Sequence, residues 1–390
     1  MGSPFAITYD ASPGARAAIE RIERAEDVRF SPNNRRLAIA DFDRDLITIA
    51  DVEITFADGP GPRVVMTDVA ECSSRHFHDP HGVAFLDDET IIVASREGTI
   101  TVHDVPGTDA TRGPVELSLV ALTPVEGFGT LLGPSALSVA RDDAGCAEVM
   151  VCNHYDDVVT RHVLRRNGSA RDHVLSNDVL VRDHLGRPDG VTLSPDGAWI
   201  ALSILDPPRV LLYERRALRN GGSDPQAILR GVWHPHGIRF SADSRSLLVA
   251  DAATPSVHIY ARNGATWHGV HHQPSDSVTV IDDDRFERGR SLGRRGPKGL
   301  DIDSSGHVLA VTCEYQPLAF FDLSAMLDRT ASIGADPARS MRYELSMMRE
   351  ERAIEARHHA RLASIMGSRS YRLTKPLRSL NEAAKRRRSA

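Results

Sequence analysis

A short motif occurs six times along this chain, and this repetition limits the possible folds more than any other feature. In the clearest copies a proline, a polar residue and a glycine precede a short strand-like segment. These copies span 80–85, 188–193, 235–240 and 297–302. The copy at 134–139 has alanine in place of the glycine, and a degenerate copy at 25–30 has aspartate there. Such self-similarity predicts an array of like structural units.

The aligned position of the motif recurs at intervals of 47 to 62 residues. It is occupied by Asp27, Gly82, Ala136, Gly190, Gly237 and Gly299. About fifty residues is the size of one four-stranded propeller blade, and short strands separated by turn residues are typical of all-β units. The sequence therefore predicts an all-β fold, a six-bladed β-propeller, over residues 1–328.

Residues 5–9 have the composition of a β-strand, and we predict that this N-terminal strand completes the last blade. Closing the ring in this way leaves no sheet edge exposed. A solenoid of stacked repeats is the main alternative. It requires polar capping repeats at both ends, and the sequence shows none.

The composition predicts a cytoplasmic protein. No stretch approaches the roughly eighteen apolar residues of a membrane-spanning helix, and no secretory signal is recognisable. The four cysteines include no Cys-x-x-Cys pair, which favours reduced thiols in the core over disulfides or a zinc site. They are Cys72, Cys146, Cys152 and Cys313.

Charge is distributed unevenly along the chain. The formal net charge is −6, yet residues 368–390 contain eight lysines and arginines and one glutamate. The predicted ring is therefore strongly acidic. This disfavours nucleic acid as a partner of the ring.

The C-terminal extension differs in character from the repeats. Residues 339–366 are rich in good helix formers without Gly or Pro, and they predict an exposed helix with a thin apolar stripe. Residues 367–390 form a basic amphipathic tail. Such a tail suits an acidic partner protein or an anionic membrane surface, which would place the protein peripherally at the inner membrane. A solvated tail without a partner is the alternative.

One segment of this tail has a recognisable relative. Residues 368–378, Ser-Arg-Ser-Tyr-Arg-Leu-Thr-Lys-Pro-Leu-Arg, resemble a short segment found near the C-termini of bacterial glycosyltransferases and other surface-polysaccharide biosynthesis proteins. In those proteins the segment tends to follow a charged helix, as it does here. The resemblance implies a role in the assembly of cell-surface polysaccharide.

The position before each aligned residue is the strongest candidate for a functional site. It is occupied by Glu26, His81, Ser135, Asp189, His236 and Lys298, all of them polar. The innermost strand of each propeller blade lines the central channel, so these positions converge on one channel mouth. We predict a ligand-binding site there, with Asn153 as a further contributor. Ordinary polar loop residues are the alternative explanation.

Two runs in the fourth repeat resemble a known group of proteins. The segments 187–197 and 209–213 are similar to the blades of six-bladed propellers of the SMP-30/gluconolactonase, paraoxonase and strictosidine-synthase-like group, and of NHL repeats. Segments Asp79–Gly82 and Cys152–Tyr155 resemble paraoxonase segments in particular. The resemblance covers most of the repeats and implies a six-bladed fold and calcium-dependent lactonase chemistry.

The same resemblance implies a calcium site at the mouth, held by Glu26, Asp27 and Asp189, with His81 near the active site. Calcium takes six to eight oxygen ligands. Where the family offers further asparagine ligands, this chain has Ser135 and His236. Calcium is therefore an implied cofactor with an incomplete set of ligands.

Three functions follow from these observations. The first is a ligand-binding propeller, with or without glycosyl transfer, in which Ser135 and the mouth carboxylates bind a sugar and Lys298 binds a phosphate. The second is a metal-dependent lactonase or esterase, in which calcium polarises the carbonyl and His81 or His236 acts as the catalytic base. The third is a protein-interaction scaffold, which an aromatic content of 5% disfavours.

Overall fold

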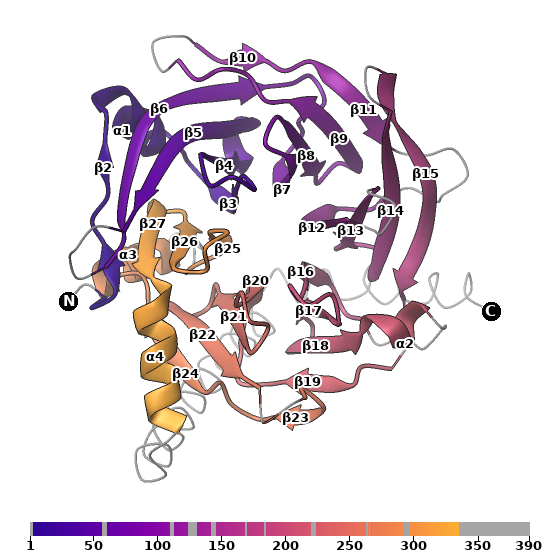
Figure 1. Cartoon of the computed structure of the whole chain (residues 1–390), viewed down its shortest axis with the longest axis vertical. Helices are drawn as coiled ribbons and strands as arrows, with labels where there is room; N and C mark the ends of the chain where they lie inside the picture. The colour runs from indigo at the N-terminus through magenta and orange to yellow at the C-terminus, as the bar shows by residue number, and fades with distance from the viewer. Residues whose placement is uncertain are drawn as a thin grey trace, which may run out of the picture. The chain divides into compact units, whose positions relative to one another are not determined.

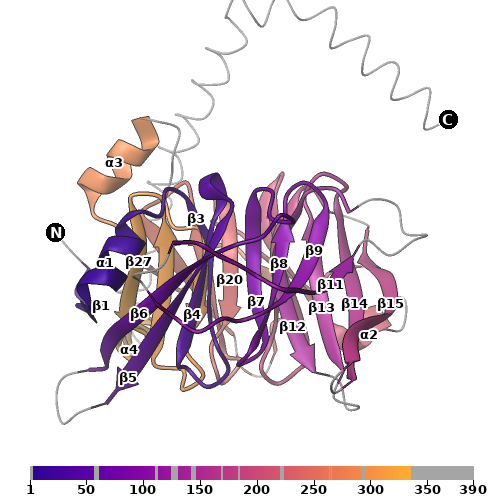
Figure 2. The same ribbon diagram turned by 90° about the horizontal axis from the view of Figure 1, so that it is seen from above.

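The computed structural model describes residues 3–334 except 57–60, 110–112, 124–130, 142–145, 168–169, 183–184, 220–223, 263, 265 and 292–295. Six β-sheets surround a central channel, as Figure 1 shows. In each sheet an inner strand lies at the channel and the following strands lie progressively farther out. In the turned view of Figure 2, the labelled inner strands β3 (Ala25–Phe30), β7 (Pro80–Asp87), β12 (Pro134–Arg141) and β20 (Pro235–Phe240) all run in roughly the same direction. The predicted six-bladed β-propeller is confirmed.

The blades follow one another in sequence order. Blade 1 contains β3 (Ala25–Phe30), β4 (Arg36–Asp41), β5 (Leu46–Thr55) and β6 (Arg63–Ser73). Blade 2 contains β7 (Pro80–Asp87), β8 (Thr90–Ser95), β9 (Thr99–Asp104) and β11 (Leu119–Thr123). Blade 3 contains β12 (Pro134–Arg141), β13 (Ala147–Asn153), β14 (Val158–Asn167) and β15 (Ala170–Val181).

The second half of the ring repeats this pattern. Blade 4 contains β16 (Pro188–Leu193), β17 (Trp199–Leu205), β18 (Pro208–Glu214) and β19 (Ala227–Leu229). Blade 5 contains β20 (Pro235–Phe240), β21 (Ser246–Asp251), β22 (Ser256–Ala261) and β24 (Asp276–Thr279). Blade 6 contains β25 (Leu300–Ile302), β26 (Val308–Cys313), β27 (Gln316–Asp322) and β1 (Ala6–Ile7).

Several short strands and helices supplement the four-stranded blades. Strands β2 (Asp10–Ala11) and β10 (Val115–Glu116) pair in parallel with β6, and β23 (Gly269–His271) pairs in parallel with β19. The helices are α1 (Pro13–Glu20), α2 (Arg215–Arg219), α3 (Asp283–Ser291), α4 (Leu323–Gly334) and a 3-10 turn at Phe42–Arg44. None of the helices in the described ranges is long and apolar enough to span a membrane.

The N-terminal strand closes the ring, as the sequence predicted, although it is shorter than expected. In β1, Ala6 pairs with Phe321 and Ile7 with Phe320 of β27, in antiparallel register. The first strand of the chain therefore occupies the outer edge of the last blade. This covers the edge of β27 that would otherwise be open to pairing with another chain.

Apolar side chains fill the space between neighbouring blades. The buried residues of the described chain form six clusters, and each joins two consecutive blades. Between blades 6 and 1, for example, Val28 and Leu37 pack with Phe320. The strands are hydrophobic on both faces because each blade is covered on both sides by another sheet.

The glycine of the repeated motif is explained by the close approach of inner strands. A Cβ atom at Gly190 would lie 2.2 Å from the carbonyl oxygen of His236 in the next blade, and one at Gly299 would lie 2.6 Å from Cα of Asp27. No real side chain tolerates such contacts with backbone. The absence of a side chain therefore lets the inner strands of adjacent blades approach closely. As a result, the residues that precede the glycines in adjacent blades lie side by side.

The end of the propeller differs from the sequence reading in one respect. The β pattern ends at Asp322, but helix α4, which the sequence analysis did not predict, begins at Leu323 and buries Leu323 and Met326 in the cluster between blades 5 and 6. The compact unit extends to Ile333. The helix expected at 339–366 and the basic tail at 367–390 lie outside the described residues. All four cysteines are described and buried, and none of them forms a disulfide.

Candidate functional site at the channel mouth

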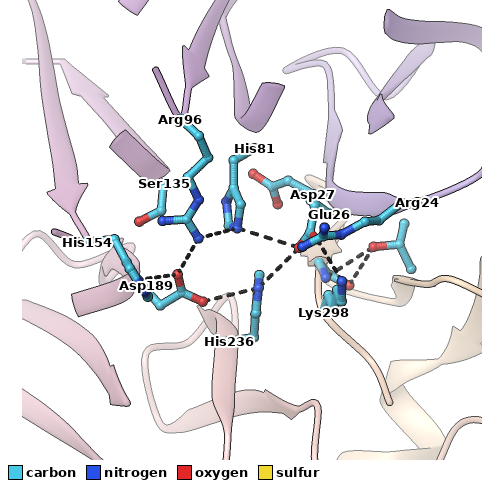
Figure 3. A network of polar contacts seen from close by, with 12 residues as sticks. Arg24, Glu26, Asp27, His81, Arg96, Ser135, His154, Asp189, His236 and Lys298 are labelled. Atoms are coloured by element: carbon cyan, nitrogen blue, oxygen red, sulfur yellow. Dashed lines mark hydrogen bonds and ion pairs between the residues drawn. The ribbon is translucent and has the colours of Figure 1, made fainter. Parts of the chain in front are cut away.

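The structure brings the predicted mouth residues together at one end of the channel. They are Glu26, His81, Ser135, Asp189, His236 and Lys298, and each has at most 7% of its surface exposed. They come from all six blades, and Figure 3 shows their side chains converging. Ionisable residues are rarely this well buried unless they are paired. The mouth is therefore a closely packed network of charges.

Local backbone irregularity points these side chains inward. The pairing of β3 with β4 shifts register between Ala25 and Asp27, and that of β7 with β8 shifts between Pro80 and Gly82. Comparable shifts occur at the same place in β12, β16 and β20. A bulge of this kind re-aims the residue within it. Here that residue is the mouth residue of the blade.

Glu26 is held on one side by positive charge. Its Oε1 accepts a hydrogen bond of 2.6 Å from Nζ of Lys298 and a second from Arg24. Lys298 also donates to Oε1 of Glu314 at 3.0 Å. Burial favours the protonated acid, but Lys298 and the two neighbouring histidines hold the pKa of Glu26 well below its usual range. Glu26 is therefore a buried carboxylate anion.

The other side of Glu26 faces two imidazoles. Its Oε2 lies 3.2 Å from Nε2 of His236 and 3.5 Å from Nε2 of His81. The two rings stack with their centroids 5.2 Å apart and an interplanar angle of 19°. Burial and the charge of Arg96 hold the pKa of His81 well below its usual range. His81 is therefore neutral near pH 7.

Asp189 forms the second anionic centre. Its Oδ2 lies 3.1 Å from Nε2 of His236, and its Oδ1 lies 3.2 Å from both Arg96 Nη2 and His154 Nδ1. Burial raises the pKa of Asp189, but these neighbours together with His81 hold it well below the usual range. Arg96 Nη2 also lies 2.8 Å from Nε2 of His81. The network thus runs without interruption from Lys298 to Arg96, as the dashed lines in Figure 3 show.

Four members of this network were missing from the predicted site. Arg24 directly precedes β3. Arg96, His154 and Glu314 each directly follow the second strand of a blade, namely β8, β13 and β26. The ends of the second strands therefore meet the starts of the first strands at the mouth. The residue type at that position differs from blade to blade, so the repeats alone do not mark it.

Ser135 and Asn153 are engaged within their own blade. Ser135 donates to the carbonyl oxygen of Cys152 at 3.3 Å. The side-chain amide of Asn153 donates to Thr160 at 3.0 Å and to the carbonyl oxygen of Val151 at 3.4 Å. Their role as ligand-binding residues stays a prediction.

Asp27 points away from Glu26, its neighbour in sequence. It accepts hydrogen bonds from Arg29 at 2.6 Å and from the backbone N–H groups of Val28 and Val83 at 3.0 and 3.2 Å. Burial raises its pKa, whereas Arg239 and the backbone donors oppose the rise. The adjacent pair of carboxylates expected for calcium therefore does not converge on one point.

A second layer of charges closes the channel beneath the mouth. Arg29 reaches from blade 1 to the carbonyl oxygens of Leu300 in blade 6 at 3.4 Å and Leu137 in blade 3 at 3.3 Å. Arg239 of blade 5 donates to Asp301 of blade 6 at 2.8 Å. Blades 1 and 3 are not neighbours, so the Arg29 side chain crosses the channel. Arg29 and Arg239 therefore link the inner strands of several blades next to the mouth network.

The mouth residues do not fit calcium. Among the described side chains, Glu26 and Asp189 are the two carboxylates beside His236, whereas calcium requires six to eight oxygens. The histidines place nitrogen atoms around Glu26, and Arg96 and Lys298 bring positive charges within hydrogen-bonding distance of the same residues. These nitrogen atoms and positive charges do not favour the binding of calcium, which prefers oxygen ligands.

Comparison with known proteins leaves the family open. No protein-family model matches the chain, and no curated protein matches it. Among solved structures, the chain is similar to a protein from Bacteroides uniformis named as a candidate 6-phosphogluconolactonase. The two share 14% sequence identity with a TM-score of 0.46, over 73% of this chain and 77% of the other. Likeness at this level carries no argument about activity. The resemblance to the SMP-30/gluconolactonase and paraoxonase group, and that of the tail, stay predictions.

Proposed function

We propose that this protein is a ligand-binding propeller that takes a sugar or sugar phosphate at its channel mouth. The observation that supports the proposal is the convergence of buried ionisable residues from separate blades on one point. Three cations, Arg24, Arg96 and Lys298, face three carboxylates, Glu26, Asp189 and Glu314. Buried ion pairs add little net stability compared with apolar packing, so a propeller does not need them. Such clusters are typical of functional sites.

The chemistry of the mouth suits a polyhydroxylated molecule. A sugar hydroxyl group both donates and accepts hydrogen bonds, and the mouth offers acceptors on Asp189 and donors on Arg96 within 3.2 Å of each other. A ligand phosphate would compete with Asp189 for Arg96, and guanidinium groups bind phosphate well. The site therefore has partners for both parts of a sugar phosphate.

The rim of the mouth adds an exposed apolar surface. Tyr155 is 67% exposed and Leu132 is 42% exposed, and the backbone N–H of Tyr155 donates to the carbonyl oxygen of Leu132 at 3.0 Å. The Tyr155 ring lies edge-on to His154, with centroids 5.1 Å apart, and Arg96 lies 5.7 Å from its centroid. An exposed aromatic face beside polar groups suits the apolar face of a sugar ring.

The wider context in this proposal is the assembly of cell-surface polysaccharide. It rests on the resemblance of segment 368–378 to the C-termini of polysaccharide biosynthesis proteins. In this reading the basic tail attaches the acidic propeller to an anionic membrane surface or an acidic protein. The propeller then presents its mouth to a glycan precursor.

Isothermal titration calorimetry with a panel of hexoses, hexose phosphates and nucleoside-diphosphate sugars tests the proposal. We expect at least one class to bind the full chain. Asp189→Asn and Tyr155→Ala should each weaken that binding at least about tenfold, since each removes a group at the mouth. Phe56→Ala is the matched control, because Phe56 is another exposed aromatic residue but packs edge-on against His307 instead. No binding across the panel, or equal losses in all three variants, would refute the proposal.

A hydrolase is the second candidate function, and one contact favours it. Nε2 of His236 lies between carboxylate oxygens of Glu26 and Asp189, at 3.2 and 3.1 Å. An imidazole held by carboxylates is a common general base for activating water. Chromogenic lactones and esters test this activity, with His236→Gln expected to abolish any turnover. Hydrolysis that survives in His236→Gln would exclude this residue as the base.

A further inference from the structure

The geometry points to a transition-metal site at the mouth, formed by Glu26, His81 and His236, that takes an ion of the zinc type. One ligand atom from each residue lies within 4.8 Å of the other two, and all three residues are buried. This site does not depend on the sugar-binding proposal. It also differs from the calcium site that the sequence resemblance implied, in its ligands and in its ion.

The spacing of the ligand atoms matches a tetrahedral ion. Zinc binds nitrogen and oxygen ligands at about 2.0–2.1 Å, so two ligands at the tetrahedral angle are roughly 3.3 Å apart. Glu26 Oε2 lies 3.2 Å from Nε2 of His236 and 3.5 Å from Nε2 of His81. Both distances from the Glu26 oxygen to the imidazole nitrogens therefore match those between two ligands of one tetrahedral ion.

Glu26 Oε2 is a buried carboxylate oxygen that is short of well-aligned hydrogen bonds. It is fully buried, and despite the short distances it makes no well-aligned hydrogen bond among the described residues. An unsatisfied buried carboxylate oxygen is costly. Three ligands of one metal ion would have this arrangement, with two imidazole nitrogens close to the carboxylate oxygen but not aligned for hydrogen bonds. A bound ion would supply the partner that Glu26 Oε2 lacks.

The residues behind Glu26 orient it for this role. Lys298 donates to Oε1 at 2.6 Å, and Arg24 binds the same oxygen. Both bonds are made to Oε1, which leaves Oε2 turned toward the imidazoles. Metal-binding carboxylates are commonly held in this way by hydrogen bonds from outside the ligand set. The ligand oxygen is therefore preorganised.

The ligand atoms determine which metal ion the site prefers. They are two imidazole nitrogens and one carboxylate oxygen. This donor set suits zinc, cobalt or nickel, whereas calcium and magnesium prefer oxygen ligands. Asp189 Oδ2 lies 3.1 Å from Nε2 of His236, beside the place of a fourth ligand. A fourth position of this kind would be open to water or to an oxygen of a bound molecule.

Arg96 competes with the ion for one ligand. Its Nη2 lies 2.8 Å from Nε2 of His81 and 3.2 Å from Oδ1 of Asp189. The lone pair on His81 Nε2 can accept a hydrogen bond from the Arg96 guanidinium or bind a metal ion, but not both. The Arg96 side chain must therefore turn away when the ion binds. Replacing Arg96 with a neutral residue should therefore strengthen metal binding. A surface histidine that binds metal by accident has no such dependence.

The test uses the full chain stripped of metal with a chelator. We expect Zn²⁺ to bind in calorimetry at one equivalent. Co²⁺ should produce the visible absorption of a four-coordinate site, and Ca²⁺ should not bind. His81→Gln, His236→Gln and Glu26→Gln should each weaken Zn²⁺ binding by at least about 100-fold, because even residues that only orient a ligand typically contribute 10–100-fold. Arg96→Gln should bind more tightly than the unmodified chain.

His268→Ala is the matched control, because His268 is an exposed histidine that pairs with Glu214; it should leave binding unchanged. Zn²⁺ and Co²⁺ failing to bind the unmodified chain overturns the site, as does unchanged affinity in both His81→Gln and His236→Gln. If those variants fail to fold by circular dichroism, anomalous scattering at the zinc edge from crystals of the unmodified chain decides, and an ion away from Glu26 overturns the proposal. The sugar panel is run with chelator present, so the two proposals fail independently.

Discussion

Glu26 and Lys298 are 272 residues apart in sequence and form a buried ion pair of 2.6 Å at the channel mouth. Glu26 is the second residue of β3, the inner strand of blade 1, and Lys298 lies two residues before β25, that of blade 6. They meet because the ring closes. The pairing of β1 with β27 closes the outer edge of blade 6, so two parts of the N-terminal region, Glu26 and β1, meet the last blade at the channel and at the outside.

Removing Lys298 should destabilise the propeller. In Lys298→Met the Glu26 carboxylate stays buried with Arg24 as its remaining cationic hydrogen-bond partner at Oε1. Removing one partner of a buried ion pair typically costs about 3–5 kcal/mol, and with Arg24 in place we expect the lower end, about 3 kcal/mol. Urea unfolding measures the loss. Adding Glu26→Gln should restore part of it, because the uncompensated charge is then gone.

Arg63→Met provides the control for this prediction. Arg63 and Asp10 form an ion pair of the same length, 2.6 Å, but their side chains are 66% and 61% exposed. Solvent screens such a pair, so the free energy of unfolding should barely change. Equal losses in Lys298→Met and Arg63→Met would show that burial of the mouth pair has no energetic weight.

A methyl group at Gly190 should disturb both stability and the mouth. The added Cβ would lie 2.2 Å from the carbonyl oxygen of His236, which is backbone and cannot swing aside. Overpacking of this kind typically costs about 1–3 kcal/mol, and the shift displaces His236 from Asp189. Thermal unfolding of Gly190→Ala measures the cost. Gly107→Ala, where an added Cβ meets nothing within 4 Å, should unfold like the unmodified chain.

The fold could be predicted because its physical cause is local and repeated. Five of the six inner strands have a glycine or alanine at the aligned position, and at Gly190 and Gly299 the next blade approaches too closely for a side chain. The same argument placed Glu26 and Lys298 at one mouth. The architecture and the starts of the inner strands were therefore readable from one motif.

The rest of the site was not readable, because no repeat marks it. Arg96, His154 and Glu314 follow second strands, and their chemical types differ from blade to blade. The outer strands β2, β10 and β23 are only two or three residues long and pair in parallel across loops. So short a segment has no periodicity to detect. The arrangement of the two histidine nitrogens around Glu26 depends on side-chain conformations, and these cannot be predicted from a pattern of residue types.

Loss of the N-terminal strand should open the ring. A chain lacking residues 1–9 loses the pairing of β1 with β27 and the edge-on contact of Tyr9 with Phe320, whose ring centroids are 5.3 Å apart. The freed edge of β27 can then pair with another chain. We expect a lower unfolding midpoint and concentration-dependent association in light scattering. A chain lacking only residues 1–3 should stay stable, and identical behaviour of the two truncations would contradict this role.

His103 should make the propeller sensitive to acid. It lies in β9, buried, with its ring edge-on to Phe77 and centroids 5.1 Å apart. Burial lowers the pKa of His103 to about 4, whereas an exposed histidine in the unfolded chain titrates near about 6.5. Between these values the unfolded chain binds a proton that the folded chain does not. The contribution of neutral His103 is therefore fully present above about pH 6.5 and is lost as the pH falls toward 4.

The size of this effect follows from the difference in pKa. A folded pKa of about 4 corresponds to a loss on the order of 3 kcal/mol between about pH 6.5 and pH 4. His103→Gln removes the titrating group, so the difference in unfolding free energy between the unmodified chain and this variant should shrink by that amount over the same range. Urea unfolding at several pH values measures it, with His268→Gln as the exposed control. Parallel stability curves for the unmodified chain and His103→Gln would mean that His103 titrates alike in both states.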